Sequence, residues 1–441
     1  MKRIIKNGTI INEGSVFPGN ILIENDTITA VGPEVADPDA ETVDASGCFV
    51  MPGVIDDQVH FREPGLTHKG DIREGSRAAV AGGVTSFMDM PNVNPPTVTL
   101  DLLREKQELA AGRSFANYSF YLGATSGNIG EIKKADPRTV CGVKVFMGSS
   151  TGNMLVSDLS ILEAIFAESP VLIATHCEDT PTIEANLKKY KAVYGAEIPV
   201  KMHPLIRSRE ACCKSSALAA SLAKKYGSRL HILHLSTAEE TALPDTCRRS
   251  EKRITGEACV HHLFFNDSAY DTLGSLVRWN PAIKTENDRR TLLDAVNRGV
   301  IDVVATDHAP HTLQEKEGSY EKAAGGGPLI QHSLVMMLEL AERGETTLEK
   351  VIDAMCHAPA EIFGIDRRGF LRPGYKADIC IFKKEKWPIT PENILYKCGW
   401  SPLTGMEFSY KVTKTFVNGH CVYDNGSLDE TPRSEMLEFV R

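Results

Sequence analysis

The sequence predicts an α/β protein, a TIM-type (β/α)8 barrel with a small β-sandwich built from both ends of the chain. In the middle of the chain, apolar strand-like runs alternate with helical stretches, which is typical of βα units around a parallel sheet. Eight such runs occur, the number that closes a barrel. Both ends hold short strand-like runs between turn residues, and neither end is large enough for a stable sheet alone.

The two ends of the chain share one pattern. In the first segment the pair Asn7-Gly8 is expected to separate two hairpin strands, and the same alternation of strand-like and turn residues returns at 377–382 and 412–419. We therefore expect the two end segments to complete a single sandwich. The predicted boundaries are 1–53 and 366–441 for the two parts of the sandwich and 54–365 for the barrel.

The predicted barrel strands are short apolar runs bounded by polar or glycine residues. Helical stretches lie between them, for example 101–111 and 208–226, and Gly227 is placed to end the second of these. The eight predicted strands are 54–60, 84–90, 116–123, 142–147, 171–176, 230–234, 254–262 and 301–307.

The composition limits the kinds of molecule that this protein is expected to bind. The 441 residues are 42% hydrophobic and 24% charged, as in a globular protein, and the net charge of -9 without a Lys/Arg run argues against nucleic acid or an anionic membrane. No apolar run approaches the ~18 residues of a membrane span. Eleven cysteines without a CxxC pair indicate reduced thiols, so we expect a cytoplasmic protein with a small-molecule substrate.

Ionisable residues gather in or just after the predicted strands. In a barrel these strand ends share one face. Histidine nitrogens with a carboxylate suit zinc or a similar ion, and a lysine inside an apolar strand is costly to bury unless its amine is neutral or modified. Each histidine alone is better explained as a hydrogen-bonded rim residue, but together the set predicts a metal centre. Its members are His60, Lys144, His176, His234 and Asp307.

Several longer motifs carry a resemblance to a known family. They are Arg62-Glu63-Pro64-Gly65, Met90-Pro91-Asn92, His176-Cys177-Glu178-Asp179, His234-Leu235-Ser236-Thr237, Asn280-Pro281 and Thr306-Asp307-His308-Ala309-Pro310-His311. Along nearly its whole length the chain resembles the dihydroorotases of the amidohydrolase superfamily. The resemblance implies reversible, metal-dependent hydrolysis of (S)-dihydroorotate to N-carbamoyl-L-aspartate in pyrimidine (UMP) biosynthesis, by a homo-oligomer.

The resemblance also implies a role for each site residue. One or two zinc ions would be held by His60, Lys144, His176, His234 and Asp307, with Lys144 carboxylated and bridging the two metals. Asp307 would also be the catalytic acid/base. The substrate carboxylate would be bound by Arg62, Asn92 and His311, and the pyrimidine ring by Asn280.

One residue departs from the family pattern. The family usually has His-x-His at the end of the first strand, and this chain has Gln58-Val59-His60. An amide oxygen is a poorer zinc ligand than imidazole. We therefore expect the metal held by His60 to bind weakly, and the site of His176 and His234 to fill first.

Two other functions are also compatible with this sequence. Another cyclic amidase, such as a hydantoinase, dihydropyrimidinase or allantoinase, would use the same metals, but a neutral ring gives Arg62 no carboxylate to bind. A non-catalytic scaffold for a pyrimidine-pathway enzyme would be consistent with Gln58, but has no need of the other ligands.

Residues 310–328 form a long polar loop with several glycines, which predicts a substrate lid or else a tolerated surface insertion.

Overall fold

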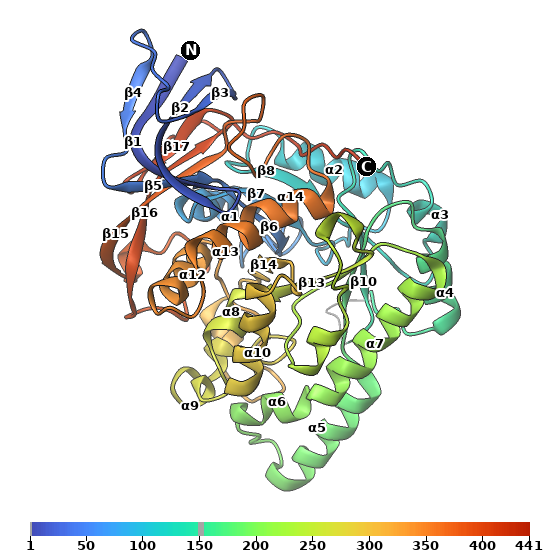
Figure 1. Cartoon of the computed structure of the whole chain (residues 1–441). Helices are drawn as coiled ribbons and strands as arrows, with labels where there is room; N and C mark the ends of the chain where they lie inside the picture. Colours follow the sequence, from blue (N-terminus) through green and yellow to red (C-terminus); the bar gives the residue numbers. More distant parts are fainter. Residues whose placement is uncertain (1, 149–153) are drawn as a thin grey trace.

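The computed structural model describes residues 2–148 and 154–441. Both ends of the chain build one nine-stranded sheet, at one end of the molecule in Figure 1. The two ends meet where β5 (Cys48–Pro52) pairs antiparallel with β15 (Ile379–Pro388). The other strands of this sheet are β1 (Lys2–Asn12), β2 (Ser15–Glu24), β3 (Thr27–Gly32), β4 (Glu41–Asp44), β16 (Glu407–Val417), β17 (His420–Asp424) and β18 (Ser427–Leu428).

The pair Asn7-Gly8 is not a turn, so that prediction is wrong. Both residues lie inside the single strand β1, at a bulge where the pairing with β2 shifts register. Asn7 takes the left-handed conformation, with φ 64°. Gly8 packs so closely that a Cβ there would lie 2.6 Å from Val50 Cγ2. The turn-like residues therefore bend one strand rather than separate two.

The middle of the chain forms two parallel sheets, of strand order β6-β7-β8 and β14-β13-β12-β11-β10-β9. Each predicted strand overlaps one or two of these elements, because buried parallel strands are continuous apolar runs. Their bounds are β6 (Val54–Val59), β7 (Val84–Asp89), β8 (Asn117–Phe120), β9 (Leu122–Gly123), β10 (Val143–Phe146), β11 (Ile173–His176), β12 (Leu230–Ile232), β13 (Ile254–Cys259) and β14 (Val303–Ala305).

The predicted strand 254–262 is wrong at its end. β13 stops at Cys259, and the short helix α8 (Val260–Phe264) follows at once, so His261 and His262 are helical. A short apolar run does not distinguish a buried strand from the first turn of a buried helix.

The first and last parallel strands lie side by side at their carboxyl ends. The backbone N–H of His60, just after β6, donates to the carbonyl of His308, just after β14, at 2.7 Å. A parallel bridge also pairs Val59 with His308. Side chains that leave the strands at this edge therefore converge, whichever of the two sheets they come from.

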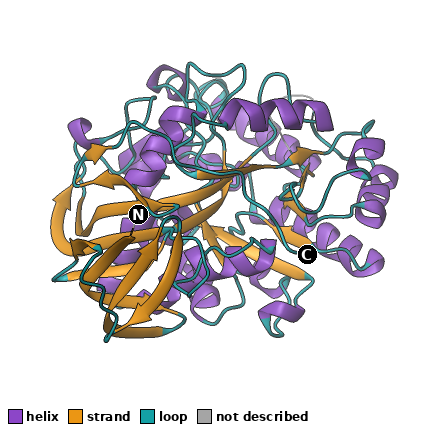
Figure 2. Ribbon diagram, turned by 90° about the horizontal axis from the view of Figure 1, so that it is seen from above, coloured by secondary structure: helices purple, strands orange, loops and turns teal. Residues whose placement is uncertain are grey.

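Helices surround the parallel strands in Figure 2. α7 (Arg209–Tyr226) is capped by Ser208 and ends at Gly227, which has φ 69°, as predicted. No helix in the described residues is long and apolar enough to cross a membrane. The others are α1 (Ile72–Ala81), α2 (Leu100–Ala110), α3 (Ile129–Ile132), α4 (Leu159–Glu168), α5 (Thr180–Tyr194), α6 (His203–Ile206), α9 (Ala269–Leu273), α10 (Glu286–Asn297), α11 (Leu313–Lys316), α12 (Ser333–Glu342), α13 (Leu348–Ile352) and α14 (Ala358–Phe363).

Candidate active site

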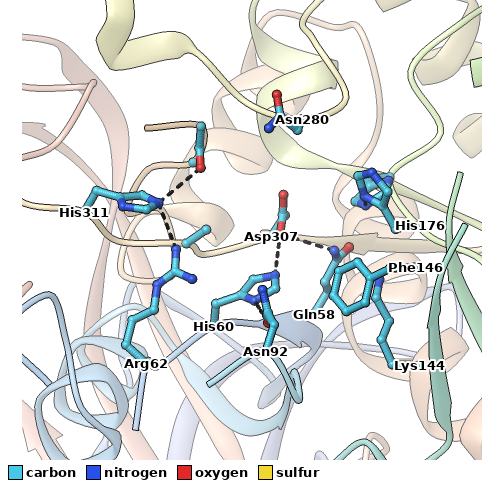
Figure 3. A pocket seen from close by; sticks show the side chains of 14 residues that line it. Gln58, His60, Arg62, Asn92, Lys144, Phe146, His176, Asn280, Asp307 and His311 are labelled. Atoms are coloured by element: carbon cyan, nitrogen blue, oxygen red, sulfur yellow. Dashed lines mark hydrogen bonds and ion pairs between the residues drawn. The ribbon is translucent and has the colours of Figure 1, made fainter. Parts of the chain in front are cut away.

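A pocket opens at the carboxyl ends of the parallel strands (Figure 3), and all nine of the site residues predicted from the sequence line it. Three of them, Arg62, His234 and Asp307, have positive φ angles of 70°, 39° and 45°. Such backbone costs about 1–3 kcal/mol per residue and is concentrated at functional sites. The lining residues are Gln58, His60, Arg62, Asn92, Lys144, Phe146, His176, His234, Asn280, Asp307, Ala309, His311, Gly325 and Gly326.

His60 and Asp307 meet on one side of the pocket. His60 Nε2 lies 3.0 Å from Asp307 Oδ1, and His60 Nδ1 lies 2.7 Å from Asn92 Oδ1. Because the amide oxygen of Asn92 accepts from Nδ1, Nε2 is the nitrogen that faces the carboxylate. A positive ion, whether a proton or a metal, fits between these two groups. Gln58 Nε2 donates to the same carboxylate oxygen at 3.2 Å.

His176 and His234 form a second pair of nitrogens in the pocket. His176 Nδ1 lies 3.0 Å from His234 Nε2, while His176 Nε2 lies 3.0 Å from Glu178 Oε2. Burial lowers the pKa of both imidazoles, so they are neutral, the form that binds metals. A carboxylate behind a histidine ring fixes which nitrogen carries the proton, as it does around metal sites. This pair therefore fits a divalent ion.

Lys144 enters the pocket from β10. Its side chain is fully buried, and among the described residues it makes no ion pair; its amine lies 4.7 Å from the centre of the Phe146 ring. Burial lowers the pKa of Lys144 to about 8. The amine therefore reaches its neutral form near physiological pH, and the neutral amine is the form that reacts with carbon dioxide.

Arg62 and His311 form a cationic wall with a lysine that was not predicted. Arg62 Nη2 lies 3.1 Å from His311 Nε2, and Lys69 Nζ lies 3.1 Å from His311 Nδ1. Burial and the neighbouring Arg62 and Lys69 hold the pKa of His311 far below its ordinary value, so the imidazole is neutral between two cations. Lys69 follows Arg62 in the same loop, and this nearness in the chain is the one signal that could have identified it.

Asn280, which also lines the pocket, offers an unpaired acceptor. Asn280 Oδ1 is buried and has no hydrogen-bond partner among the residues that the structure describes. A Cβ at Gly325 would lie 2.6 Å from Asn280 Nδ2, so only glycine leaves room for this amide. Asn280 can therefore accept a hydrogen bond from an N–H group of a bound molecule.

A buried lysine outside the pocket positions two of its residues. Lys106 Nζ lies 2.6 Å from Asp89 Oδ2 and donates to the carbonyl of Met90 at 2.9 Å. Asp89 Oδ1 accepts the backbone N–H of Phe61 at 2.8 Å. Both side chains are buried, so the pair ties together the chain segments that continue to Arg62 and Asn92.

Comparison with known proteins agrees with this geometry. The model of the Amidohydrolase family matches residues 49–422. A dihydroorotase of Aquifex aeolicus (strain VF5) is 34% identical over 96% of this chain and 99% of its own length, and an allantoinase of Bacillus velezensis is 29% identical over 96% and 94%. The solved structure of an L-hydantoinase (dihydropyrimidinase) from Arthrobacter aurescens superposes with a TM-score of 0.94 and 27% identity, covering 99% of this chain and 100% of that one. The chain belongs to the amidohydrolase family.

Proposed function

We propose that this protein is a dihydroorotase, which hydrolyses (S)-dihydroorotate reversibly to N-carbamoyl-L-aspartate. The observation that carries the proposal is the buried guanidinium of Arg62, which lines the pocket beside His311 and makes no ion pair with the described residues, because a ring that bears a carboxylate gives it a partner and a neutral ring does not. The 34% identity to a dihydroorotase supports it.

The fold and the metal belong to the same proposal. The contact between His60 and His308 supports closure of the parallel strands into a (β/α)8 barrel, beside a sandwich made from the nine-stranded sheet. His176 and His234 would hold one zinc ion, and His60 and Asp307 a second, with Lys144 as a carbamate between them. Bound there, zinc would polarise the ring amide carbonyl and activate water.

The other roles, substrate binding and proton transfer, fall to different residues of the pocket. Arg62 and His311 bind the carboxylate with Asn92, and the free oxygen of Asn280 accepts a ring N–H. Asp307 takes a proton from the attacking water and delivers it to the ring nitrogen that departs. Its backbone strain and its contacts with His60 and Gln58 hold the carboxylate in one place for both transfers.

The test compares a charged with an uncharged ring. Replacing Arg62 by methionine removes a charge-assisted hydrogen bond of about 1.5–3 kcal/mol, so kcat/KM for dihydroorotate should fall about 10- to 100-fold. Arg73, which is half-buried and does not line the pocket, should leave kcat/KM unchanged when it is replaced in the same way. Zinc per chain is counted in the same samples. Turnover of hydantoin or allantoin, with none of dihydroorotate, would instead assign another cyclic amidase.

A further inference from the structure

A second group of metal-type side chains lies just outside the pocket. Cys259 ends β13, and His261 and His262 stand in the first turn of α8. One ligand atom from each of these three residues lies within 4.8 Å of the other two, and all three residues are buried. None of them lines the pocket. We propose that Cys259, His261 and His262 form a separate, structural site for a borderline-soft divalent cation of the zinc type.

The spacing of these atoms suits such an ion. Around tetrahedral zinc with one sulfur and two nitrogen ligands, neighbouring ligand atoms are about 3.3–3.6 Å apart. Side-chain shifts of about 1 Å therefore bring the three atoms into place. Thiolate and imidazole together favour zinc over magnesium or calcium, which take oxygen ligands.

The hydrogen bonds leave the required lone pairs available. His262 Nε2 lies 3.1 Å from the carbonyl of Pro281, so Nε2 carries the proton and Nδ1 does not. Nδ1 is buried without a partner in the described part of the chain. A ligand histidine that donates its other N–H to a backbone carbonyl is the usual arrangement around metals. Here the carbonyl holds the ring in the tautomer that a metal needs.

His261 is held rigidly beside His262. Its ring stacks on Trp279 at 4.4 Å and 14°, and the two histidine rings lie 4.2 Å apart. Neither ring nitrogen makes a hydrogen bond of good geometry with the described residues. The carbonyl of Thr306 is near enough to the ring to favour a proton on the nitrogen that faces it. Two buried neutral imidazoles with unused nitrogens side by side are costly without a shared partner.

The cysteine completes the set and links it to the pocket. Cys259 Sγ lies 3.3 Å from Glu257 Oε1 and 3.9 Å from Gln58 Oε1, and Gln58 lines the pocket. Metal binding would replace the thiol proton, which leaves to solvent through the adjacent pocket, and would form a sulfur–metal bond. An ion here would brace the end of β13 against the first turn of α8.

A neighbouring group has a different set of ligand atoms. Asp57, His231 and Glu257 are also buried and close together. His231 Nε2 lies 3.1 Å from Asp57 Oδ2, and His231 Nδ1 lies 2.7 Å from the Thr255 hydroxyl. This group offers one imidazole and two carboxylates without a thiol, so it lacks the sulfur ligand that distinguishes the Cys259 site.

The test replaces the native metal with cobalt. Purified protein is stripped with a chelator, loaded with cobalt, and examined for the sulfur-to-cobalt charge-transfer absorption that only a thiolate ligand produces. We expect the band in the wild type, its loss together with one ion per chain in Cys259→Ser and His262→Gln, and its retention in Cys141→Ser, which alters another buried cysteine. His262→Gln keeps the thiol, so it decides the matter if Cys259→Ser does not fold.

Two results would overturn the site. One is cobalt-saturated wild type without the band; the other is an unchanged band and metal count in Cys259→Ser. Turnover of dihydroorotate is measured on the same samples. No described residue that lines the pocket is a cysteine, so the band does not report on the pocket, and its loss in Cys259→Ser assigns it to this site. The dihydroorotase proposal can therefore fail without affecting it.

Discussion

If a metal binds beside His60, as we propose, the side chain of Gln58 limits how tightly it is held. Its amide donates to Asp307, 3.2 Å away, where an imidazole would instead offer a ligand nitrogen. Replacing Gln58 by histidine should therefore raise the zinc retained after a chelator wash by about one ion per chain relative to wild type. The comparison is made by elemental analysis, with Gln314→His on the surface as the control. Equal zinc in both proteins would show that Gln58 does not limit the site.

Most of the metal-type residues could be predicted because they stand at or just after the end of a parallel strand, and parallel strands share one edge. Lys144 lies within β10, and Asn280, far beyond β13, was identified from a family motif. His60 and Asp307 are far apart in the chain yet 3.0 Å apart in the fold. Lys69 was missed because it lies in a loop without periodicity, and its contact with His311 spans 242 residues. Phe146 was missed because an aromatic residue in an apolar strand looks like ordinary core.

At the scale of elements, the segment predicted as a lid contains a buried anchor. It includes α11 (Leu313–Lys316), which a polar, glycine-rich sequence did not indicate. Lys316 is 1% exposed, and its amine donates to the carbonyls of Arg278, Ala324 and Gly326 at 3.3, 2.8 and 2.7 Å. These bonds hold Gly326 in the wall of the pocket, so this part of the segment is built into the fold.

Replacing Lys316 by methionine should loosen that wall. Each buried carbonyl left without a donor costs about 1–3 kcal/mol, so amide hydrogen exchange across residues 312–326 should become at least tenfold faster. KM for dihydroorotate should rise with it, because Gly325 and Gly326 line the pocket. Lys322→Met, on the exposed side of the same segment, is the control. Unchanged exchange in the Lys316 variant would contradict an anchoring role.

An ion pair between a loop and helix α11 should make the rim of the pocket sensitive to acid. Glu315 pairs with Lys69 at 2.8 Å. Burial alone would raise the pKa of Glu315, but bonds from Lys69 and the Thr312 backbone outweigh it and lower the pKa from 4.5 to about 2. Because the folded value is the lower one, the pair stabilises the fold fully above pH 4.5 and progressively less as the pH falls toward 2.

Glu315→Gln measures this contribution. At pH 6 the variant should unfold with a free energy about 0.2–1 kcal/mol below wild type, the usual range for a partly exposed pair. Near pH 2 most of this difference should be lost, because about half of the Glu315 carboxyl groups are then protonated in the folded protein and nearly all in the unfolded chain. Thermal unfolding of both proteins across this pH range gives the difference. An undiminished difference in unfolding free energy at pH 2 would mean that packing, and not charge, accounts for the difference.

The differences between the predicted and the observed elements have a common cause. Apolar runs locate buried strands well, and the eight predicted strands overlap β6 to β14. The sequence pattern does not show where a run changes from strand to helix, as it does after Cys259, or where turn-like residues bulge a strand, as at Asn7. Those choices are made by contacts with distant residues, such as Val50 against Gly8.

At the scale of the whole molecule, the end of the described chain ties distant elements together. Tyr118 in β8 exchanges backbone hydrogen bonds with Glu435 and Leu437 at 3.1 and 2.8 Å, and the N–H of Val440 donates to Gly364 at 2.7 Å. Leu437 and Phe439 are 0% and 3% exposed. Residues 435–441 therefore act as a strap from β8 to the end of α14.

Removing this strap should destabilise the fold without touching the pocket. Two buried apolar side chains contribute about 1.5–3 kcal/mol each, so a chain that stops at Ser434 should lose about 3–6 kcal/mol of unfolding free energy, measured by denaturant titration. Val440→Ala is the control, because that side chain is 71% exposed and should cost almost nothing. Since no strap residue lines the pocket, KM of the folded fraction should stay the same. Equal unfolding free energies of the shortened and full chains would show that the strap does not stabilise the fold.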